Sequence, residues 1–287
     1  AEDYFLPIRK TVDLNQPDWD GEKVIMIPEI KAAYDAVAEA GLICPDQSYE
    51  MGGMQLPLVV ASCAMGYVTA AASTTNGFHA LTAANANLLE THASQEQIDT
   101  WVPRLRTGEF AGTMALSEPQ AGSSLADMRT KAVAQDDGTY RIFGNKIWIS
   151  GGDHELSSNI VHAVLARIEG APPGVKGISM FICPKFLLNE DGSVGARNDV
   201  QLAGLFHKMG GRGQTSTALN FGEGEGAVAY LVGEPHQGLR YMFHMMNEAR
   251  VMVGSSGATL AMAGYQYSLD YAKERPQGRK PSSKDPL

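Results

Sequence analysis

The sequence has few cysteines, and their spacing excludes the sites that cysteines usually build. Only three occur among the 287 residues, and Cys44, Cys63 and Cys183 lie far apart without any CxxC pair. An odd number with no motif spacing indicates neither a disulfide framework nor a zinc site. The composition therefore fits a reducing interior best.

The chain is also short of basic residues and of long apolar runs. Lys and Arg total 23 against 32 Asp and Glu, and the densest basic stretch, residues 273–284, is interrupted by prolines and by Glu274. This balance argues against a nucleic-acid partner. The longest apolar run, residues 56–72, includes polar residues and a glycine and is shorter than a bilayer requires. We therefore expect it to form a buried helix, and we expect no membrane span.

Leader and metal motifs are missing as well. No signal peptide is visible, although the chain opens with Ala rather than Met, which suggests a processed, tagged or incomplete polypeptide. The seven histidines have no HExxH spacing or other spacing that would converge on a metal. With 44% apolar residues, the chain should bury a substantial core in one large domain or two small ones.

Residues 1–110 have helical patterns. PEIKAAYDAVAEAGL repeats apolar residues at steps of three and four and stops at Gly41, and a further helix starts near Pro57. SQEQIDTWVPRL begins with Ser94 followed three residues later by Gln97, which is a capping pattern, and should end before RTG. This region is expected to be an N-terminal helical domain.

The pattern changes in residues 111–233 and again in residues 234–287. The middle region offers short β-prone runs between Gly, Pro and Asp clusters, which predict a compact antiparallel barrel or sandwich. GGRG at residues 210–213 does not fit a dinucleotide fingerprint, because no βαβ pattern surrounds it. After Pro235 a helical pattern continues for over thirty residues, and its apolar residues would need neighbours on more than one side, as in a bundle.

Two segments of the middle region carry most of the functional signal: ALSEPQAGSS, residues 115–124, and NKIWISGG, residues 145–152. Between them, Asp136, Asp137 and Gly138 supply turn chemistry, and the following residues approach apolar alternation. A hairpin at this turn would bring the two segments together. Taken alone, SEP followed by AGSS could be an ordinary polar loop.

Together the two segments resemble the flavin-contacting segments of acyl-CoA dehydrogenases. The resemblance runs from about residue 30 through HKMGGRG to the NEAR helix, and ARNDVQLAGLFHKMG and YAKERPQGR point to the subfamily that oxidises 3-methylthiopropionyl-CoA. It implies an α+β fold with an N-terminal helical domain (1–110), a middle antiparallel β-barrel domain (111–233) and the first helix of a C-terminal four-helix bundle (234–287).

The resemblance also implies FAD as cofactor and assigns residues to it. Met114, Leu116 and Ser117 match the strand that meets the pyrimidine side of the flavin, where backbone groups and a hydroxyl can satisfy its polar edge. Trp148 and Ser150 match the residues that cover the ring and donate a hydrogen bond toward N5. Family members usually have Thr in place of both serines. Viewed separately, the tryptophan could be a core aromatic and the serines could be strand-end hydroxyls.

Acyl-CoA is the substrate that the resemblance implies. Ser123 matches a residue near the CoA pyrophosphate and pantetheine, although Ser follows it where Asp is usual. Asn247 and Arg250, three residues apart on a helix, match the pair that holds the CoA adenosine end. Arg275 and Gln277 match positions that reach the FAD pyrophosphate of a neighbouring subunit. As bare sequence, Arg250 could be a solvated surface residue and ERPQGR a helix end.

The base that removes the substrate's α-proton has no match in this chain. In most of the family the catalytic Glu lies in the last helical domain, which would be beyond Leu287. A minority of members place Glu immediately before the matching Arg, but this chain has Ala249 there and Glu248 one step earlier. One residue turns a helical side chain by about 100°, so Glu248 should point elsewhere. We therefore expect a truncated or partial acyl-CoA dehydrogenase.

The implied function is FAD-dependent α,β-dehydrogenation of an acyl-CoA thioester, with electrons passing to electron-transfer flavoprotein. A homodimer or homotetramer is implied, in the bacterial cytoplasm or in the mitochondrial matrix of a eukaryote. An acyl-CoA oxidase would have the same fold. A scaffold or acyl-CoA-binding module that has no base is the alternative outside enzymology.

Overall fold

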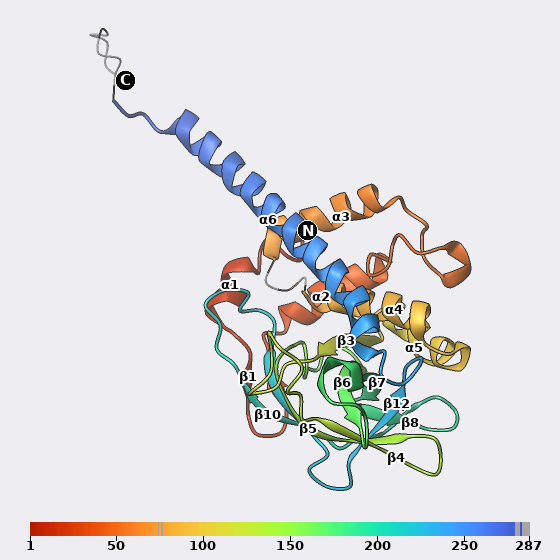
Figure 1. Ribbon diagram of the computed structural model, residues 1–287. Helices are drawn as coiled ribbons and strands as arrows, with labels where there is room; N and C mark the ends of the chain where they lie inside the picture. The colour runs from red at the N-terminus through yellow and green to blue at the C-terminus, as the bar shows by residue number, and fades with distance from the viewer. Residues whose placement is uncertain (74, 76, 279–281, 283–287) are drawn as a thin grey trace.

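The protein is described by a computed structural model that places residues 1–73, 75, 77–278 and 282. Helices from the first third of the chain pack against a β-barrel, and a long last helix runs along the helical layer and extends beyond the folded body (Figure 1). This order of helices, strands and a final helix confirms the predicted α+β fold class.

The N-terminal region is helical, as predicted. Its helices are α1 (Arg9–Leu14), α2 (Glu29–Glu39), α3 (Leu58–Ala72), α4 (Gly77–His92) and α5 (Gln95–Thr107). A small hairpin of β1 (Asp18–Trp19) and β2 (Val24–Ile25) follows α1, and one 3-10 turn spans Tyr49–Met51. Helix α2 ends where the sequence indicates, because Gly41 adopts a φ of +68°, a conformation that favours glycine.

Helix α5 begins with the predicted capping box. The Ser94 hydroxyl accepts from the Gln97 N–H at 3.3 Å, and the Gln97 side chain accepts from the Ser94 N–H at 3.2 Å. The helix continues slightly past its predicted end, to Thr107, and stops at Gly108 with a φ of +75°. A Cβ on Gly108 would lie 2.8 Å from the Ile43 side chain, so this close approach requires glycine.

Helix α3 is only partly buried, so the expectation of a buried helix over residues 56–72 was half right. Its small residues Ala61 and Ala72 face the core, but Val59 and Tyr67 are 74% and 75% exposed. Both faces of the helix are therefore apolar, and only one is covered. No helix in the described residues is long and apolar enough to cross a membrane.

The middle region is a β-barrel with extensions. Its strands are β3 (Phe110–Ala115), β4 (Lys131–Ala134), β5 (Tyr140–Ser150), β6 (Asn159–Ile168), β7 (Ile178–Pro184), β10 (Val200–Leu205), β11 (Ser216–Phe221) and β12 (Ala227–Leu231). A 3-10 turn (Gly174–Gly177) precedes β7, and a separate hairpin pairs β8 (Phe186–Leu188) with β9 (Val194–Arg197). Residues 140–150, YRIFGNKIWIS, form the single long strand β5.

The pairing of these strands closes a ring. Strand β5 pairs with β12, β12 with β7, β7 with β6, β6 with β4, and β4 returns to β5. The β4–β5 hairpin turns at Asp136 to Gly138, as predicted. The barrel is not purely antiparallel, however, because β3 and β4 both run parallel to β6. Neither β3 nor β4 is joined to β6 by a tight hairpin. The alternation of apolar residues in the sequence does not show whether two strands run parallel or antiparallel.

Two apolar clusters hold these parts together. One lies between the helical layer and the barrel and draws on α4, α5, β3, β6 and the last helix, with Leu88, Leu105, Phe110, Val161 and Met242 fully buried. The other fills the barrel interior, with Ile142, Val164, Phe181, Leu219 and Phe221. The strand β3 borders both clusters, so its end is fixed from two sides.

The last helix, α6 (Gly238–Glu274), confirms the predicted long helix. It packs on α4, α3 and β7, and Met242 and Met245 in its first turns are buried. Farther along, the side chains of Val253, Leu260 and Tyr267 are exposed. The outer half of α6 extends beyond the folded body (Figure 1), and its apolar side chains are exposed among the described residues.

Candidate active site

The end of β3 and the end of β5 are joined where the two motif segments meet. The backbone N–H of Ile147 donates to the Ser117 carbonyl at 2.9 Å, and the Lys146 ammonium donates to the Leu116 carbonyl at 3.0 Å. The β4–β5 hairpin pairs residues farther back along the strands, so these direct bonds hold the segments together. The predicted approach of residues 115–124 to residues 145–152 is confirmed.

A buried ion pair lies under this junction. Lys146 Nζ is 3.0 Å from Glu118 Oε1, and the two side chains are 0% and 3% exposed. Glu118 also accepts from the backbone N–H groups of Arg129 and Thr130 at 2.7 and 3.0 Å. Every oxygen of the carboxylate is thus paired, as a buried charge requires.

The electrostatics keep this pair ionised. Burial alone would raise the pKa of Glu118, but the Lys146 ammonium and the N–H donors from Arg129 and Thr130 outweigh it and lower the pKa to about 2. Burial lowers the pKa of Lys146, and the Glu118 carboxylate opposes that change. The pair therefore acts as a fixed clamp between the two segments.

Trp148 lies beside this clamp in an unusual conformation. Its φ is +62°, which a bulky residue rarely adopts, and the residue is 57% exposed. The register of β5 against β11 shifts at this point, so β5 carries one extra residue and a bulge. The indole stacks on Phe206 with centroids 3.8 Å apart. Bulges and positive φ values of this kind occur preferentially at functional sites.

The hydroxyls of Ser117 and Ser150 are available for a ligand. Both residues are half-buried, and neither hydroxyl has a hydrogen-bond partner among the described residues. Ser150 lies opposite Ser216 of β11, two residues beyond Trp148. Unpaired, half-buried hydroxyls next to an exposed aromatic ring suit the polar edge of a flavin, so these residues fit FAD.

Met114 and Leu116 are also near this junction, whereas Ser123 is on the surface. The side chains of Met114 and Leu116 are half-buried and pack against the apolar cluster between the helical layer and the barrel. Ser123 is exposed in the loop after the bridge between Glu118 and Ala121. The structure therefore brings Met114, Leu116, Ser117, Trp148 and Ser150 together, and Ser123 lies a short way along the same segment.

Asn247 and Arg250 form a pair on α6. An Arg250 guanidinium nitrogen donates to Asn247 Oδ1 at 2.7 Å, so the two side chains share a face as their spacing predicts. The guanidinium also lies over the Phe243 ring, 5.4 Å from its centroid. Both members of the pair are exposed.

Arg275 and Gln277 lie at the far end of α6, away from the other candidate residues. The last turns of the helix extend beyond the body of the protein (Figure 1). Arg275 donates to the Tyr271 hydroxyl at 3.0 Å, and both Arg275 and Gln277 are exposed. Within one copy of the chain they do not join the group around Trp148. Leu287, beyond which the base was expected, lies outside the described residues.

Glu248 faces α4. Its carboxylate accepts from Asn87 Nδ2 at 3.3 Å, and His244 Nε2 lies 3.2 Å away. Partial burial raises the pKa of this carboxyl. The Glu248 side chain therefore lies between α6 and α4. Because Glu248 is one residue before Ala249 on the helix, its side chain points in a different direction from that of residue 249.

Several histidines are buried, but they do not gather. His79, His154 and His162 are each held separately, the last by Thr113 at 2.7 Å, and burial lowers the pKa of each. No group of His, Cys, Asp or Glu in the described part of the chain could hold a metal ion.

Sequence reasoning missed the Glu118–Lys146 clamp and Phe206. The sequence did contain a signal for the clamp. Lys146 is four residues after Ile142, so the two side chains lie on the same face of β5, and a charged residue on a buried face requires a buried partner. Nothing in the sequence indicated that Phe206 would stack on Trp148, because that contact depends on how β10 and β11 are placed.

Comparison with known proteins agrees with this geometry. The family model "Acyl-CoA dehydrogenase, N-terminal domain" matches residues 8–109, and the model "Acyl-CoA dehydrogenase, middle domain" matches residues 113–223. The crystal structure of acyl-CoA dehydrogenase from Geobacillus kaustophilus superposes with a TM-score of 0.76 at 23% identity, over 99% of this chain and 68% of that one. At this identity the superposition speaks for the fold alone.

Curated relatives are more similar in sequence. The chain is 43% identical over 256 residues to 3-methylmercaptopropionyl-CoA dehydrogenase of Ruegeria pomeroyi, which covers 89% of this chain and 43% of that protein. It is 38% identical over 265 residues to butyryl-CoA dehydrogenase of Syntrophomonas wolfei, covering 90% of the chain and 43% of that protein. The chain thus spans less than half the length of these relatives. Because two models of one family together match most of its residues, the chain belongs to the acyl-CoA dehydrogenase family.

Proposed function

We propose that the protein catalyses FAD-dependent α,β-dehydrogenation of an acyl-CoA thioester to the 2-enoyl-CoA. The observation that carries the proposal is the junction of β3 and β5, where Trp148 is exposed at a bulge with a φ of +62° beside the unpaired Ser117 hydroxyl. Bound FAD would supply the hydride acceptor for this reaction. We assign flavin binding to this junction because the chain belongs to the acyl-CoA dehydrogenase family.

The chain's own residues would hold and orient the flavin. We assign the backbone of Met114 and Leu116 and the Ser117 hydroxyl to the pyrimidine edge, and Trp148 and Ser150 to the ring face and N5 side. The Glu118–Lys146 clamp fixes the distance between these two sets. A fixed site of this kind contributes mainly by positioning the reacting groups.

The CoA portion is assigned to a different part of the surface. Ser123 would contact the pyrophosphate and pantetheine, and Arg250, held by Asn247, would bind the adenosine end through its guanidinium. We assign Arg275 and Gln277 to the FAD pyrophosphate of a second subunit, which agrees with their place after the end of α6, the helix that extends beyond the folded body (Figure 1). A homodimer or homotetramer follows from that assignment.

The finer parts of the proposal rest on relatives. One curated relative is named a 3-methylmercaptopropionyl-CoA dehydrogenase, which favours a short sulfur-containing acyl group as substrate. We further propose electron-transfer flavoprotein as the acceptor, a bacterial cytoplasmic location, and a division into residues 1–110, 111–233 and 234–287. No carboxylate of the chain is assigned as the base, because Ala249 and Glu248 do not offer one where the family uses it.

Anaerobic reduction of the flavin tests the proposed activity. The uninterrupted natural protein, loaded with FAD, should lose its visible flavin absorbance when 3-methylthiopropionyl-CoA or butyryl-CoA is added. The 287-residue chain, loaded in the same way, should not. Bleaching by neither protein, with flavin bound, would contradict the dehydrogenase assignment. Rapid bleaching by the 287-residue chain would show that it contains a base, and Glu248→Gln would be the first variant to examine.

A further inference from the structure

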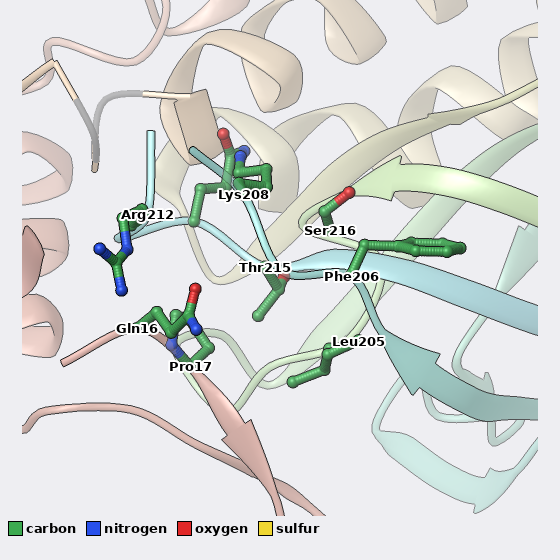
Figure 2. Close-up of a pocket in the computed structure, with 9 residues that line it drawn as sticks. Gln16, Pro17, Leu205, Phe206, Lys208, Arg212, Thr215 and Ser216 are labelled. Carbon is green, nitrogen blue, oxygen red and sulfur yellow. The ribbon is translucent and has the colours of Figure 1, made fainter. Parts of the chain in front are cut away.

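A small pocket on the barrel gathers positive charge without any acid. It lies at the loop between β10 and β11, residues 206–215, and Gln16 and Pro17 close its other side (Figure 2). Lys208 and Arg212 both line it, and no Asp or Glu does. Asp18, the nearest acid along the chain, accepts from its own neighbour's backbone, the Trp19 N–H, at 2.8 Å.

Both cations lack partners within the described residues. Neither Lys208 nor Arg212 forms an ion pair or a side-chain hydrogen bond there, whereas the buried Lys146 and Lys185 are each paired with a carboxylate. The formal net charge of the protein is −9, so acids are not scarce. Both residues are half-buried, and burial lowers the pKa of Lys208 because it disfavours the charged ammonium. Such an arrangement becomes favourable once an anion occupies it.

Further hydrogen-bond donors of the loop are buried and unsatisfied. Arg212 Nε, Gln214 Nε2 and the Thr215 hydroxyl have no hydrogen-bond partner in the part of the chain that the structure describes, and Thr215 is only 1% exposed. Each buried donor without a partner costs about 1–3 kcal/mol, so native proteins rarely leave several together. An oxyanion at the pocket could accept from all of them and balance both cations.

The dimensions of the pocket limit what can enter. Its volume is about 10 Å³, which is roughly the room needed for one water-sized group. A single oxygen atom of a larger group can therefore enter, with the rest of that group lying at the mouth beside Lys208 and Arg212. The guanidinium fork and the ammonium suit the several oxygens of a phosphate group.

We propose that the β10–β11 loop binds a phosphate group through Lys208, Arg212, Gln214 and Thr215. Phe206 lines the same pocket and stacks on Trp148, so a phosphate bound here would lie next to the exposed indole. The phosphate could be that of free inorganic phosphate or that of a nucleotide such as FAD or CoA. The site is defined without reference to flavin chemistry and does not depend on the proposed function.

Binding of inorganic phosphate, FAD and CoA to the 287-residue chain tests the site. Isothermal titration calorimetry at low ionic strength should show that Arg212→Gln and Lys208→Gln each lower phosphate affinity at least tenfold. Lys10→Gln removes the same charge from an exposed position on α1 and should bind as the wild type does. Thr215→Val should weaken binding without reducing the free energy of unfolding, because it removes an unpaired buried hydroxyl.

The three probes identify the source of the phosphate. A parallel loss of affinity for FAD or for CoA would assign the site to that nucleotide, and a loss confined to inorganic phosphate would assign it to the free anion. Wild-type affinity of both Arg212→Gln and Lys208→Gln for all three probes would overturn the proposal. That result would leave flavin binding and bleaching by the natural protein unaffected, so the two proposals can fail separately.

Discussion

At the scale of single residues, Glu118 and Lys146 explain how two distant segments of sequence become one site. The pair is almost fully buried, and it is linked by hydrogen bonds to Leu116 on one side and to Arg129 and Thr130 on the other. Removing one member of a buried pair leaves an uncompensated charge, whereas removing both does not. The local geometry thus depends on two buried residues that we do not assign to a ligand.

Glu118→Gln should destabilise the protein by about 3–5 kcal/mol, because the Lys146 ammonium would remain buried without its carboxylate. The double variant Glu118→Gln with Lys146→Met should recover part of that loss. Urea unfolding followed by circular dichroism measures both. A single variant within about 0.5 kcal/mol of the wild type would show that the pair does not hold the junction.

The same pair predicts how stability depends on pH. The pKa of Glu118 is lowered from its ordinary value of 4.5 to about 2 in the folded protein. Its contribution is therefore complete above pH 4.5 and is lost as the pH falls toward 2. The difference in unfolding free energy between wild type and Glu118→Gln should be constant from pH 5 to 7 and shrink below pH 4.5. A difference that grew on acidification would contradict this assignment of charge.

Trp148 offers a test that separates binding from stability. Its indole is exposed and contacts Phe206, so Trp148→Ala should change the unfolding free energy little while lowering FAD affinity about three- to tenfold, the range expected for one aromatic stack. The affinity can be followed by titration with FAD, and unfolding by urea. A large loss of stability with unchanged FAD affinity would mean that the tryptophan is a structural residue only.

At the scale of elements, the helices and most strands could be predicted from the sequence. Local chemistry determines them: Gly41 ends α2, Ser94 and Gln97 cap α5, and NIVHAVLARI forms β6 as a single apolar run. The bulge at Trp148 in β5 and the parallel direction of β3 could not be predicted, because both depend on partner strands distant in sequence.

The same distinction applies to the candidate site. The positions of Ser117 and Trp148 followed from the motif segments, and the sharing of a face by Asn247 and Arg250 followed from helix geometry. The pocket at Lys208 and Arg212 did not, because its unpaired donors become visible only once the loop lies against Gln16 and Pro17.

The capping box of α5 gives a prediction for one element. Ser94→Ala should lower the unfolding free energy by about 1 kcal/mol, because the N–H of Gln97 loses its acceptor. Ser94→Asp, which can accept the same hydrogen bond, should retain most of the stability. Equal losses in the two variants, measured by thermal or urea unfolding, would show that the hydroxyl contributes nothing at this helix start.

At the scale of the whole molecule, the helical layer and the barrel share one apolar cluster, and the site lies at the strand that borders it. Beyond this cluster, the outer faces of α3 and α6 expose apolar side chains, among them Val59, Tyr67, Leu260 and Tyr267. Apolar surface of this extent usually contacts another protein surface. The relatives, of which the chain covers 43%, have further residues that could supply it.

The central claim is that this fold carries a flavin site at Trp148 and Ser117, and the most direct test is the cofactor content of the purified natural protein. The preparation should be yellow, with flavin absorbance in the visible range, and denaturation should release FAD. Substitution of Trp148 by Ala should lower that content, while Lys10→Gln should not. A colourless protein that releases no FAD, and that takes up none after reconstitution, would contradict the account.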